Sequence, residues 1–266
     1  MVEKLKNLLS RCYVGLIVIF LYAPIFVLIM LSFNRSRSRV TWGGFTLSWY
    51  QELFSNSQIM DALVATLVLA FSSAMIATVI GVSAAIGIHA MRRRNYQVMM
   101  VFTNIPILNA DIVTGISLML WFVYFLPLGF TSVLIAHITF NIPYVILSVM
   151  PKIKQMNVSL YEAARDLGAN AGYAFFKVVL PQLTGGIVSG FFMAFTMSMD
   201  DFVITYFTKG AGVNTLSTMI YGEIRKGIKP EMYALSTIIF VTMFLILLVV
   251  NYLPGKKPAS KETRRF

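Results

Sequence analysis

Long apolar segments alternate with short polar ones along most of this chain. Residues 12–33 form a first apolar run, and its length of about 21 residues suffices for a helix to cross a bilayer. Asn34 and Arg35 follow it directly, without a small-residue cleavage site, so we expect a retained helix rather than a signal peptide. Further apolar segments lie at residues 62–90, 98–126, 130–150, 185–207 and 233–253. The pattern predicts an all-α polytopic membrane protein with six transmembrane helices, which form a single transmembrane domain over residues 1–266.

Two features modify this simple pattern. The third segment is interrupted by four residues, which are Asn104, Pro106, Asn109 and Asp111. This combination predicts a broken helix in which backbone groups without helical hydrogen bonds line a cavity. The polar loop at 34–61 contains apolar and aromatic side chains at helical spacing, so we expect a short amphipathic helix lying at the membrane surface there.

Composition and charge support a membrane protein and orient it. Hydrophobic residues make up 58% of the chain and charged residues 12%, and a soluble domain carries about twice that share of charge. The net charge of +11 does not indicate nucleic-acid binding, since the basic residues flank apolar segments instead of forming one patch. Lys and Arg are about twice as frequent on the side of both termini, which predicts cytoplasmic termini and a basic cytoplasmic tail at 254–266. Arg35, Arg37 and Arg39 run against that rule.

Three carboxylates fall within the predicted spans: Asp111 in the third, and Asp200 and Asp201 in the fifth. A charged residue at a helix centre costs roughly 2.5–3.5 kcal/mol on insertion scales, so these side chains are not expected to face lipid. No Lys or Arg is expected at the same depth. We therefore expect Asp200 and Asp201 to face one polar lumen and, with Asp111, to line a path for a cation. Helix capping or hydrogen bonding between helices is the alternative.

Aromatic and polar side chains in the same spans have two interpretations each. Trp121, Tyr124 and Tyr144 could add cation–π surface to the substrate path, although aromatic residues in membrane helices mostly serve packing. His137 and Asn141 lie four residues apart on one helix face and are expected to form hydrogen bonds between helices. With two His and one Cys in the chain, we expect neither a metal site nor a catalytic centre.

The most informative polar stretch lies at 151–184. Ser159 and Glu162 have the spacing of a capping box, which predicts a short helix from Leu160 to Leu167. Gly168 can end that helix in the left-handed conformation. Asn170 can then cap a second short helix over 171–179, before the next apolar segment begins.

This stretch resembles the EAA signature of ABC importer permeases. Glu162, Ala163 and Ala164 are followed after three residues by Gly168 and, nine residues later, by Val178 where the family has Ile, with Leu180 and Pro181 completing the signature. The resemblance implies a type I ABC importer permease fold in which 151–184 is a cytoplasmic coupling-helix loop that docks on an ATPase. The chain has no G-x4-G-K-[ST] phosphate loop, so ATP and Mg would be bound by a partner and this chain would hold no cofactor.

Shorter stretches around Trp49, Asp111, His137, Asp200 and Glu231 resemble the spermidine/putrescine permeases. That resemblance implies a bacterial inner-membrane heterodimer with a second permease subunit, two ATP-binding subunits and an extracytoplasmic polyamine-binding protein. A permease for another solute, such as an opine or a metal chelate, is an alternative. An intramembrane aspartyl protease is a remote one, because it needs aspartates converging from two helices and a G-x-G-D motif. A channel or secondary carrier would not require the EAA loop.

Overall fold

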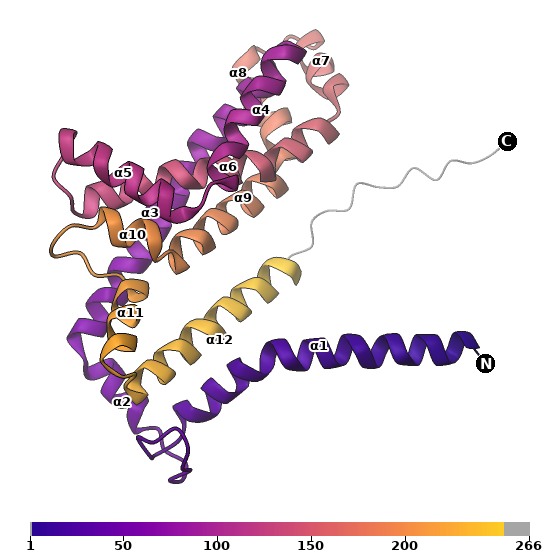
Figure 1. The fold of residues 1–266 in the computed structure, drawn as a ribbon. Helices are drawn as coiled ribbons and strands as arrows, with labels where there is room; N and C mark the ends of the chain where they lie inside the picture. The colour runs from indigo at the N-terminus through magenta and orange to yellow at the C-terminus, as the bar shows by residue number, and fades with distance from the viewer. Residues whose placement is uncertain (1, 253–266) are drawn as a thin grey trace. The chain divides into compact units, whose positions relative to one another are not determined.

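The computed structural model describes residues 2–252, and every regular element in that range is a helix (Figure 1). The predicted basic tail at 254–266 lies outside the described residues. The chain forms two compact units: one contains residues 1–60 and 222–266, and the other residues 61–221.

The first unit combines both ends of the chain. Its helices are α1 (Val2–Ser32), α2 (Ser48–Ser55) and α12 (Pro230–Tyr252), and both α1 and α2 contact α12. The short helix expected in the loop after the first span is therefore present as α2. Its Trp49 and Leu53 side chains are buried in the protein, so part of its apolar face packs against other helices, and its place at the membrane surface stays a prediction.

The second unit contains most of α3 (Ser57–His89) and the long helices α6 and α9. Between and after them lie shorter helices, which are α4 (Arg93–Leu108), α5 (Asp111–Phe125), α7 (Val158–Asp166), α8 (Ala171–Ala174), the π-helix η1 (Phe175–Val179) and α10 (Val203–Thr208). Helix α11 (Leu216–Lys226) begins in this unit and continues into the first unit from Gly222. Helix α6 (Phe130–Gln155) and helix α9 (Leu180–Asp200) run side by side over most of their length (Figure 1).

A ladder of small residues brings α9 close to α6. The buried face of α9 has a small residue at every fourth position, and these residues are Gly186, Gly190, Ala194 and Ser198. A Cβ atom added to Gly190 would lie 3.3 Å from the Cα of Val145. Small residues at this spacing allow the backbones of two membrane helices to approach closely, so that the helices associate by van der Waals packing. The ladder therefore fixes which α6 side chains face α9.

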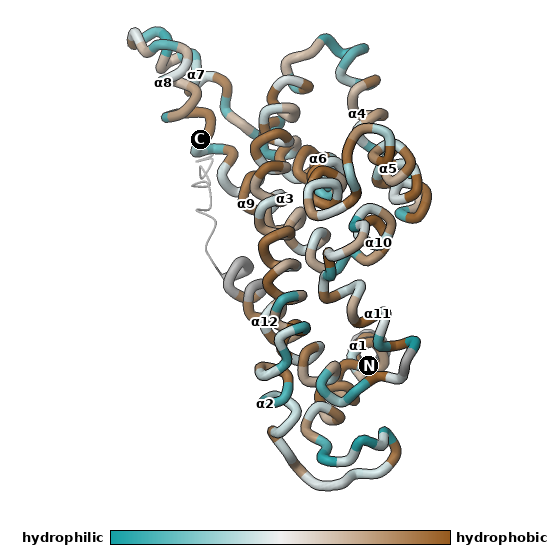
Figure 2. The backbone as a smooth tube through the Cα atoms, turned by 90° about the vertical axis from the view of Figure 1, so that its left-hand side faces the viewer, coloured by the Kyte–Doolittle hydropathy of each residue, from teal (hydrophilic) through white to brown (hydrophobic). Residues whose placement is uncertain are grey.

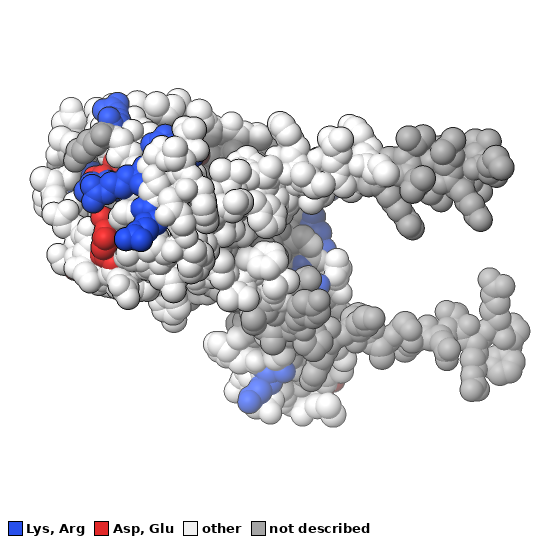
Figure 3. Space-filling view, turned by 90° about the horizontal axis from the view of Figure 1, so that it is seen from below, with Lys and Arg blue, Asp and Glu red and all other residues white. Residues whose placement is uncertain are grey.

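Four helices of the described chain have the length and apolar character needed to cross a membrane, and the bent pair α4–α5 makes a fifth if it counts as one span. Apolar residues run along α3 and α6 in particular (Figure 2). Blue patches of Lys and Arg interrupt an otherwise mostly uncharged face in Figure 3. The predicted sixth span lies within α12, where the described apolar stretch covers Pro230–Leu245.

The predicted fifth span differs from the structure in its second half. The helix ends at Asp200, and α10 begins as a separate helix at Val203. The residues at 185–207 are thus two helices joined at Asp201 and Phe202. This break determines where both carboxylates of the pair point.

Candidate functional site

The interruption expected in the third span is a sharp bend. Helix α4 contains Pro106 and ends at Leu108, and Asn109 and Ala110 then adopt extended backbone angles. The axes of α4 and α5 meet at 101°. Pro106 has no N–H to donate to the backbone oxygen of Phe102, which weakens the last turns of α4 before the bend. Asp111 is exposed as the first residue of α5, where the partial positive charge of a helix N-terminus favours a carboxylate.

Helix α5 is held against α10 by a glycine. A Cβ atom at Gly115 would lie 3.1 Å from a ring carbon of Phe207 and 3.4 Å from the Cα of Ile204. Ile204 and Phe122 are buried in one apolar cluster with residues of α6. This packing brings the N-terminal end of α5, which carries Asp111, toward the segment that follows α9.

The carboxylate of Asp201 caps α10. Its Oδ1 accepts the N–H of Ile204 at 3.3 Å, and its Oδ2 accepts both the N–H and the hydroxyl of Thr205, each at 2.8 Å. The Nε2 of His137 lies 3.5 Å from the same Oδ2 and 2.8 Å from the Thr205 hydroxyl. The Asp201 side chain is only 10% exposed and the His137 side chain 0%.

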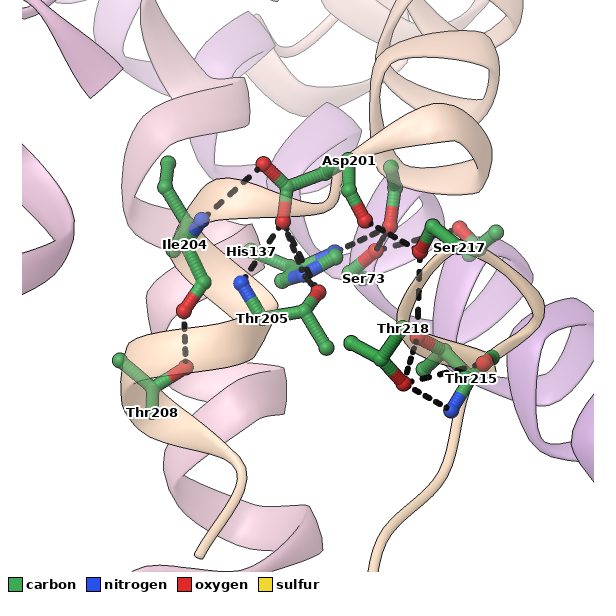
Figure 4. A network of polar contacts seen from close by, with 11 residues as sticks. Ser73, His137, Asp201, Ile204, Thr205, Thr208, Thr215, Ser217 and Thr218 are labelled. Atoms are coloured by element: carbon green, nitrogen blue, oxygen red, sulfur yellow. Dashed lines mark hydrogen bonds and ion pairs between the residues drawn. The ribbon is translucent and has the colours of Figure 1, made fainter. Parts of the chain in front are cut away.

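This contact is one part of a polar network that joins five helices, which are α3, α6, α9, α10 and α11 (Figure 4). The Nδ1 of His137 hydrogen-bonds to the hydroxyl of Ser198, which lies 3.0 Å from the hydroxyl of Ser73 on α3. The hydroxyl of Ser217, in the first turn of α11, donates to the backbone oxygen of Asp201 at 2.6 Å. Polar side chains bonded in this way hold membrane helices in one arrangement. The expectation of interhelical bonding by His137 is confirmed.

Asp200 points elsewhere and is exposed. Its carboxylate is near enough to that of Asp111 for the two to repel each other, and Asp111 also acts electrostatically on the hydroxyl of Tyr144. The expectation that Asp200 and Asp201 face one lumen is therefore wrong, since the break after α9 turns Asp201 inward and leaves Asp200 outside. Asp111 thus lies within electrostatic range of both Asp200 and the half-buried Tyr144.

The other two aromatic candidates lie apart from Asp111. Trp121 and Tyr124 are 57% and 84% exposed on the second half of α5. At about 1.5 Å per residue, they lie roughly 15 and 20 Å along the helix from Asp111. The Trp121 ring packs on its neighbours Phe122 and Phe125, with centroids 5.6 and 5.2 Å away.

Asn141 does not form the hydrogen bond between helices that was expected for it. It is fully buried on α6, one turn from His137, yet neither its amide nitrogen nor its amide oxygen has a hydrogen-bond partner in the part of the chain that the structure describes. The small-residue ladder supplies the reason, because Gly190 packs against Val145 and Ser198 bonds His137, which leaves Ala194 opposite the amide. Alanine offers no polar group.

Replacing Asn141 with Leu is expected to raise the stability of the purified protein. The amide loses its water on burial without compensation, which costs about 1–3 kcal/mol, whereas Leu has a similar size and no polar atoms. Thermal unfolding in detergent measures the effect. His137→Leu is the matched control on the same face, and it should destabilise because it removes two bonded ring nitrogens. Equal destabilisation by both variants would contradict the prediction.

The EAA stretch forms an exposed helical turn. Asn157, not Ser159, caps α7, because the Asn157 side chain accepts the N–H of Ser159. The predicted capping box is therefore wrong: Ser159 already lies inside the helix. Gly168 ends the segment with φ +88, as expected, and Asn170 caps α8 through the N–H of Tyr173. No residue of α7 is buried.

The second short helix does not end before Pro181. Helix α8 continues through η1 directly into α9, which has Pro181 in its first turn. The side chain of Gln182 accepts the N–H of Asn157 at 3.3 Å. Tyr161 of α7 packs against the buried core shared by α3, α6 and α9. Movement of α7 is thereby linked to the long helices of the same unit.

Three features of the chain together indicate its class. The chain has several membrane-length helices, one broken span with an exposed carboxylate, and a short exposed helix tied to the long ones. Within residues 2–252, no group of three or more His, Cys, Asp or Glu side chains stands where it could hold a metal ion. Membrane-length helices with an exposed carboxylate at a broken span are typical of a membrane transport subunit.

The chain belongs to the family described as "Binding-protein-dependent transport system inner membrane component", which matches residues 1–254. It is 36% identical to the spermidine/putrescine transport system permease protein PotC of Escherichia coli K12, over 97% of each chain. It is 34% identical to PotC of Haemophilus influenzae, over 94% of this chain and 97% of that one. The putrescine transport system permease protein PotI of E. coli K12 is 34% identical over 92% of this chain and 90% of its own length.

Solved structures support the same fold. A bacterial ABC transporter that imports the acidic polysaccharide alginate superposes with a TM-score of 0.68 at 14% identity, over 95% of this chain and 98% of that one. An amino acid ABC transporter crystallised with histidines gives a TM-score of 0.57 at 17% identity, over 78% of this chain and 97% of that one. The fold is that of a type I ABC importer permease. The chain is a permease subunit of an inner-membrane transport system, not an enzyme.

The alternative expected for the aspartates, helix capping or hydrogen bonding between helices, holds for Asp201, but its pairing with His137 was not predicted. A signal for the cap was present, since Asp201 stands three residues before Ile204, within the spacing over which a side chain can accept an N–H of a new helix. It was obscured because residues 185–207 are apolar enough to be taken as one span.

Proposed function

We propose that the chain is the permease subunit of a polyamine importer, forming half of the translocation path. The observation that supports this most directly is the region that contains Asp111, Asp200 and Tyr144. Within the described residues, neither carboxylate has an ion pair with Lys or Arg. Exposed carboxylates without a basic partner, at a bend between two membrane helices, suit the ammonium groups of a polycation. The relatives named for spermidine and putrescine transport are consistent with this substrate.

Along the path, the carboxylates would transiently replace the water around the ammonium groups of the substrate. Asp111 and Asp200 repel each other when both are charged. A cation between them is therefore attracted by both carboxylates and also offsets their mutual repulsion. Two spaced acids bind a flexible polycation weakly at each point, and weak binding at several sites allows release. Trp121 and Tyr124 would contribute aromatic surface further along α5. Asp201 would hold α9 and α10 in place rather than contact the substrate.

The remaining parts of the assembly follow from the class of transporter. We propose a heterodimer with a second permease subunit, two ATP-binding subunits that hold ATP and Mg, and an extracytoplasmic polyamine-binding protein. The charge distribution favours cytoplasmic termini. Glu162, Ala163, Ala164, Gly168, Leu180 and Pro181 would couple ATPase closure to the membrane helices, because α7 is exposed and contacts the core through Tyr161. The relatives give no support to an opine or metal-chelate substrate or to an aspartyl protease.

Uptake by the reconstituted complex tests this function. The two permeases, the ATPase and the binding protein are placed in proteoliposomes with ATP inside or outside as the orientation requires, and labelled spermidine uptake is measured against competing putrescine. We expect ATP-dependent uptake that both polyamines inhibit. Failure of any polyamine to be carried or to compete, together with uptake of another solute, would show that the substrate is wrong.

Replacing Gly168 with Ala is expected to reduce uptake and ATPase stimulation several-fold. A Cβ atom at φ +88 is strained by about 1–2 kcal/mol, so the turn after α7 should shift. Gly172→Ala is the matched control, since Gly172 has ordinary backbone angles and its added Cβ would meet only a side-chain oxygen at 3.6 Å. Both variants should reach the membrane in equal amounts. Equal uptake by the two would argue against a coupling role for this turn.

A further inference from the structure

The buried faces of α6 and α9 carry two matched series of residues, each with a period of four. The series on α9 is the small-residue ladder, and the series on α6 consists of His137, Asn141, Val145, Val149 and Ile153. Gly190 packs against Val145, and the Ser198 hydroxyl bonds to His137. The two helices are therefore antiparallel, and each residue of the ladder faces one residue of the α6 series.

Asn141 is the member of this series that has no suitable counterpart. It is 0% exposed, and neither of its polar atoms has a hydrogen-bond partner among the residues that the structure describes. Ala194 faces it, and the next residue of the ladder is Ser198. A buried amide without partners is uncommon in folded proteins and calls for an explanation. Here the amide lies one helical turn from a hydroxyl that could satisfy it.

A displacement of one turn would preserve the packing of this interface. If α9 moved by about 5.4 Å toward the C-terminal end of α6, Ala194 would face Val145 and Gly190 would face Val149. Small residues would again lie against β-branched ones, as they do in the present arrangement. Intermediate displacements would set the ridges of one helix against the ridges of the other, which close packing disfavours. The interface therefore has two discrete registers.

We propose that the transporter uses both registers, and that in the second one Ser198 leaves His137 and bonds to Asn141. The hydroxyl makes one bond to α6 in either register, so this bond favours neither of them strongly. An amide can accept a hydrogen bond from a hydroxyl or donate one to it, so Asn141 suits either direction. One-turn displacements of packed elements are among the ways in which proteins switch between two states. This switch goes beyond the proposed function and does not depend on which solute is carried.

Both ends of α9 are suited to such a movement. At its C-terminal end, Asp201 has extended backbone angles, and α10 is a separate helix that packs against α5. At its N-terminal end, α9 continues without a break into η1 and α8. Helix α9 can thus move relative to α10 while it stays joined to the turn at Gly168. Movement of that turn along the axis of α6 would be transmitted through α9 to Ser198.

Crosslinking between cysteines tests the register directly. In the present register the Ser148 hydroxyl lies 3.9 Å from the sulfur of Met193, and in the second register Ser148 would instead meet Met197, one turn further along α9. The matched pairs are Ser148→Cys with Met193→Cys and Ser148→Cys with Met197→Cys, made in a Cys12→Ser chain with cysteine-free partner subunits. The complete transporter in nanodiscs is oxidised without nucleotide and after trapping with ADP and vanadate. The ratio of crosslinking by the two pairs should change at least about fivefold between these conditions.

Two single substitutions test the role of Asn141. Asn141→Leu removes the bond of the second register, and Ala194→Ser offers the amide a hydroxyl in the present one. Both should hold the protein in the present register, so crosslinking through Met197 should fall and ATP hydrolysis by the complex should slow several-fold, while thermal stability is kept or raised. Ala194→Gly is the matched control, because it changes no polar group, and it should retain the nucleotide-dependent change in crosslinking.

Two results would overturn the second register. One is a crosslinking ratio that does not change with nucleotide in the chain that keeps Asn141. The other is a change that persists in full in Asn141→Leu, because the amide would then not be the partner of Ser198. Crosslinking requires no transported solute. If the register changes with nucleotide but no polyamine is carried, the second register stands and the proposed substrate fails.

Discussion

Asp111→Asn is expected to reduce polyamine uptake by about tenfold or more while leaving the transporter assembled. The carboxylate is exposed at the bend between α4 and α5, with no ion pair among the described residues. A charge-assisted contact with an ammonium group is worth roughly 1.5–3 kcal/mol, and asparagine keeps the shape but not the charge. Initial uptake rates in proteoliposomes, corrected for the amount of complex, measure the loss.

Asp61→Asn is the matched control for this experiment. Asp61 is also an exposed carboxylate on a membrane-length helix, α3, but it lies outside the region that contains Asp111 and Asp200. It should transport at the rate of the unmodified protein. Asp200→Asn should resemble Asp111→Asn, and the double variant should lose less than the product of the two effects if one cation contacts both. Normal uptake by Asp111→Asn would remove this residue from the path.

The second large effect is expected on stability, at the neighbouring aspartate. Asp201→Ala removes three hydrogen bonds to α10 and leaves the buried His137 ring without its acid. A lost helix cap typically costs about 1 kcal/mol, and each buried donor left unsatisfied costs about 1–3 kcal/mol. We expect a clear fall in the thermal unfolding temperature and in the amount of folded protein in the membrane.

The adjacent residue provides the comparison. Asp200→Ala should leave the unfolding temperature nearly unchanged, because the Asp200 side chain is exposed and makes none of the side-chain contacts that join His137, Ser198 and Thr205. Asp200→Ala should instead lower uptake per assembled complex. The two neighbours would then differ in kind, one affecting folding and the other transport. Equal loss of stability in both variants would contradict the assignment of Asp201 to the network.

Much of the fold follows from the sequence because apolar length alone indicates helices in a bilayer. The bend in the third span was predictable, since Pro106 and Asn109 interrupt an otherwise apolar segment. The turn at Gly168 was predictable because only glycine adopts its backbone angles without strain. These are local features, decided by residues within one helical turn.

The unpredicted features depend on contacts between distant parts of the chain. The break after Asp200 exists because Asp201 caps a new helix while His137, 64 positions earlier, approaches the same oxygen. The isolation of Asn141 depends on which residue of α9 lies opposite it. Neither the contact of His137 with Asp201 nor the surroundings of Asn141 can be inferred from hydropathy. The substrate region could be guessed by residue type, but the division of labour between Asp200 and Asp201 required the geometry.

The π-helix η1 has a consequence for the EAA signature itself. A π-helical turn holds one residue more than an α-helical turn, and each residue of an α-helix rotates the chain by about 100°. The spacing of nine residues between Gly168 and Val178 runs into η1, which covers Phe175–Val179. Losing or gaining one residue there would rotate Leu180 and the small residues on the buried face of α9 away from α6. The fixed spacing therefore keeps α9 in angular phase with the turn that ends α7.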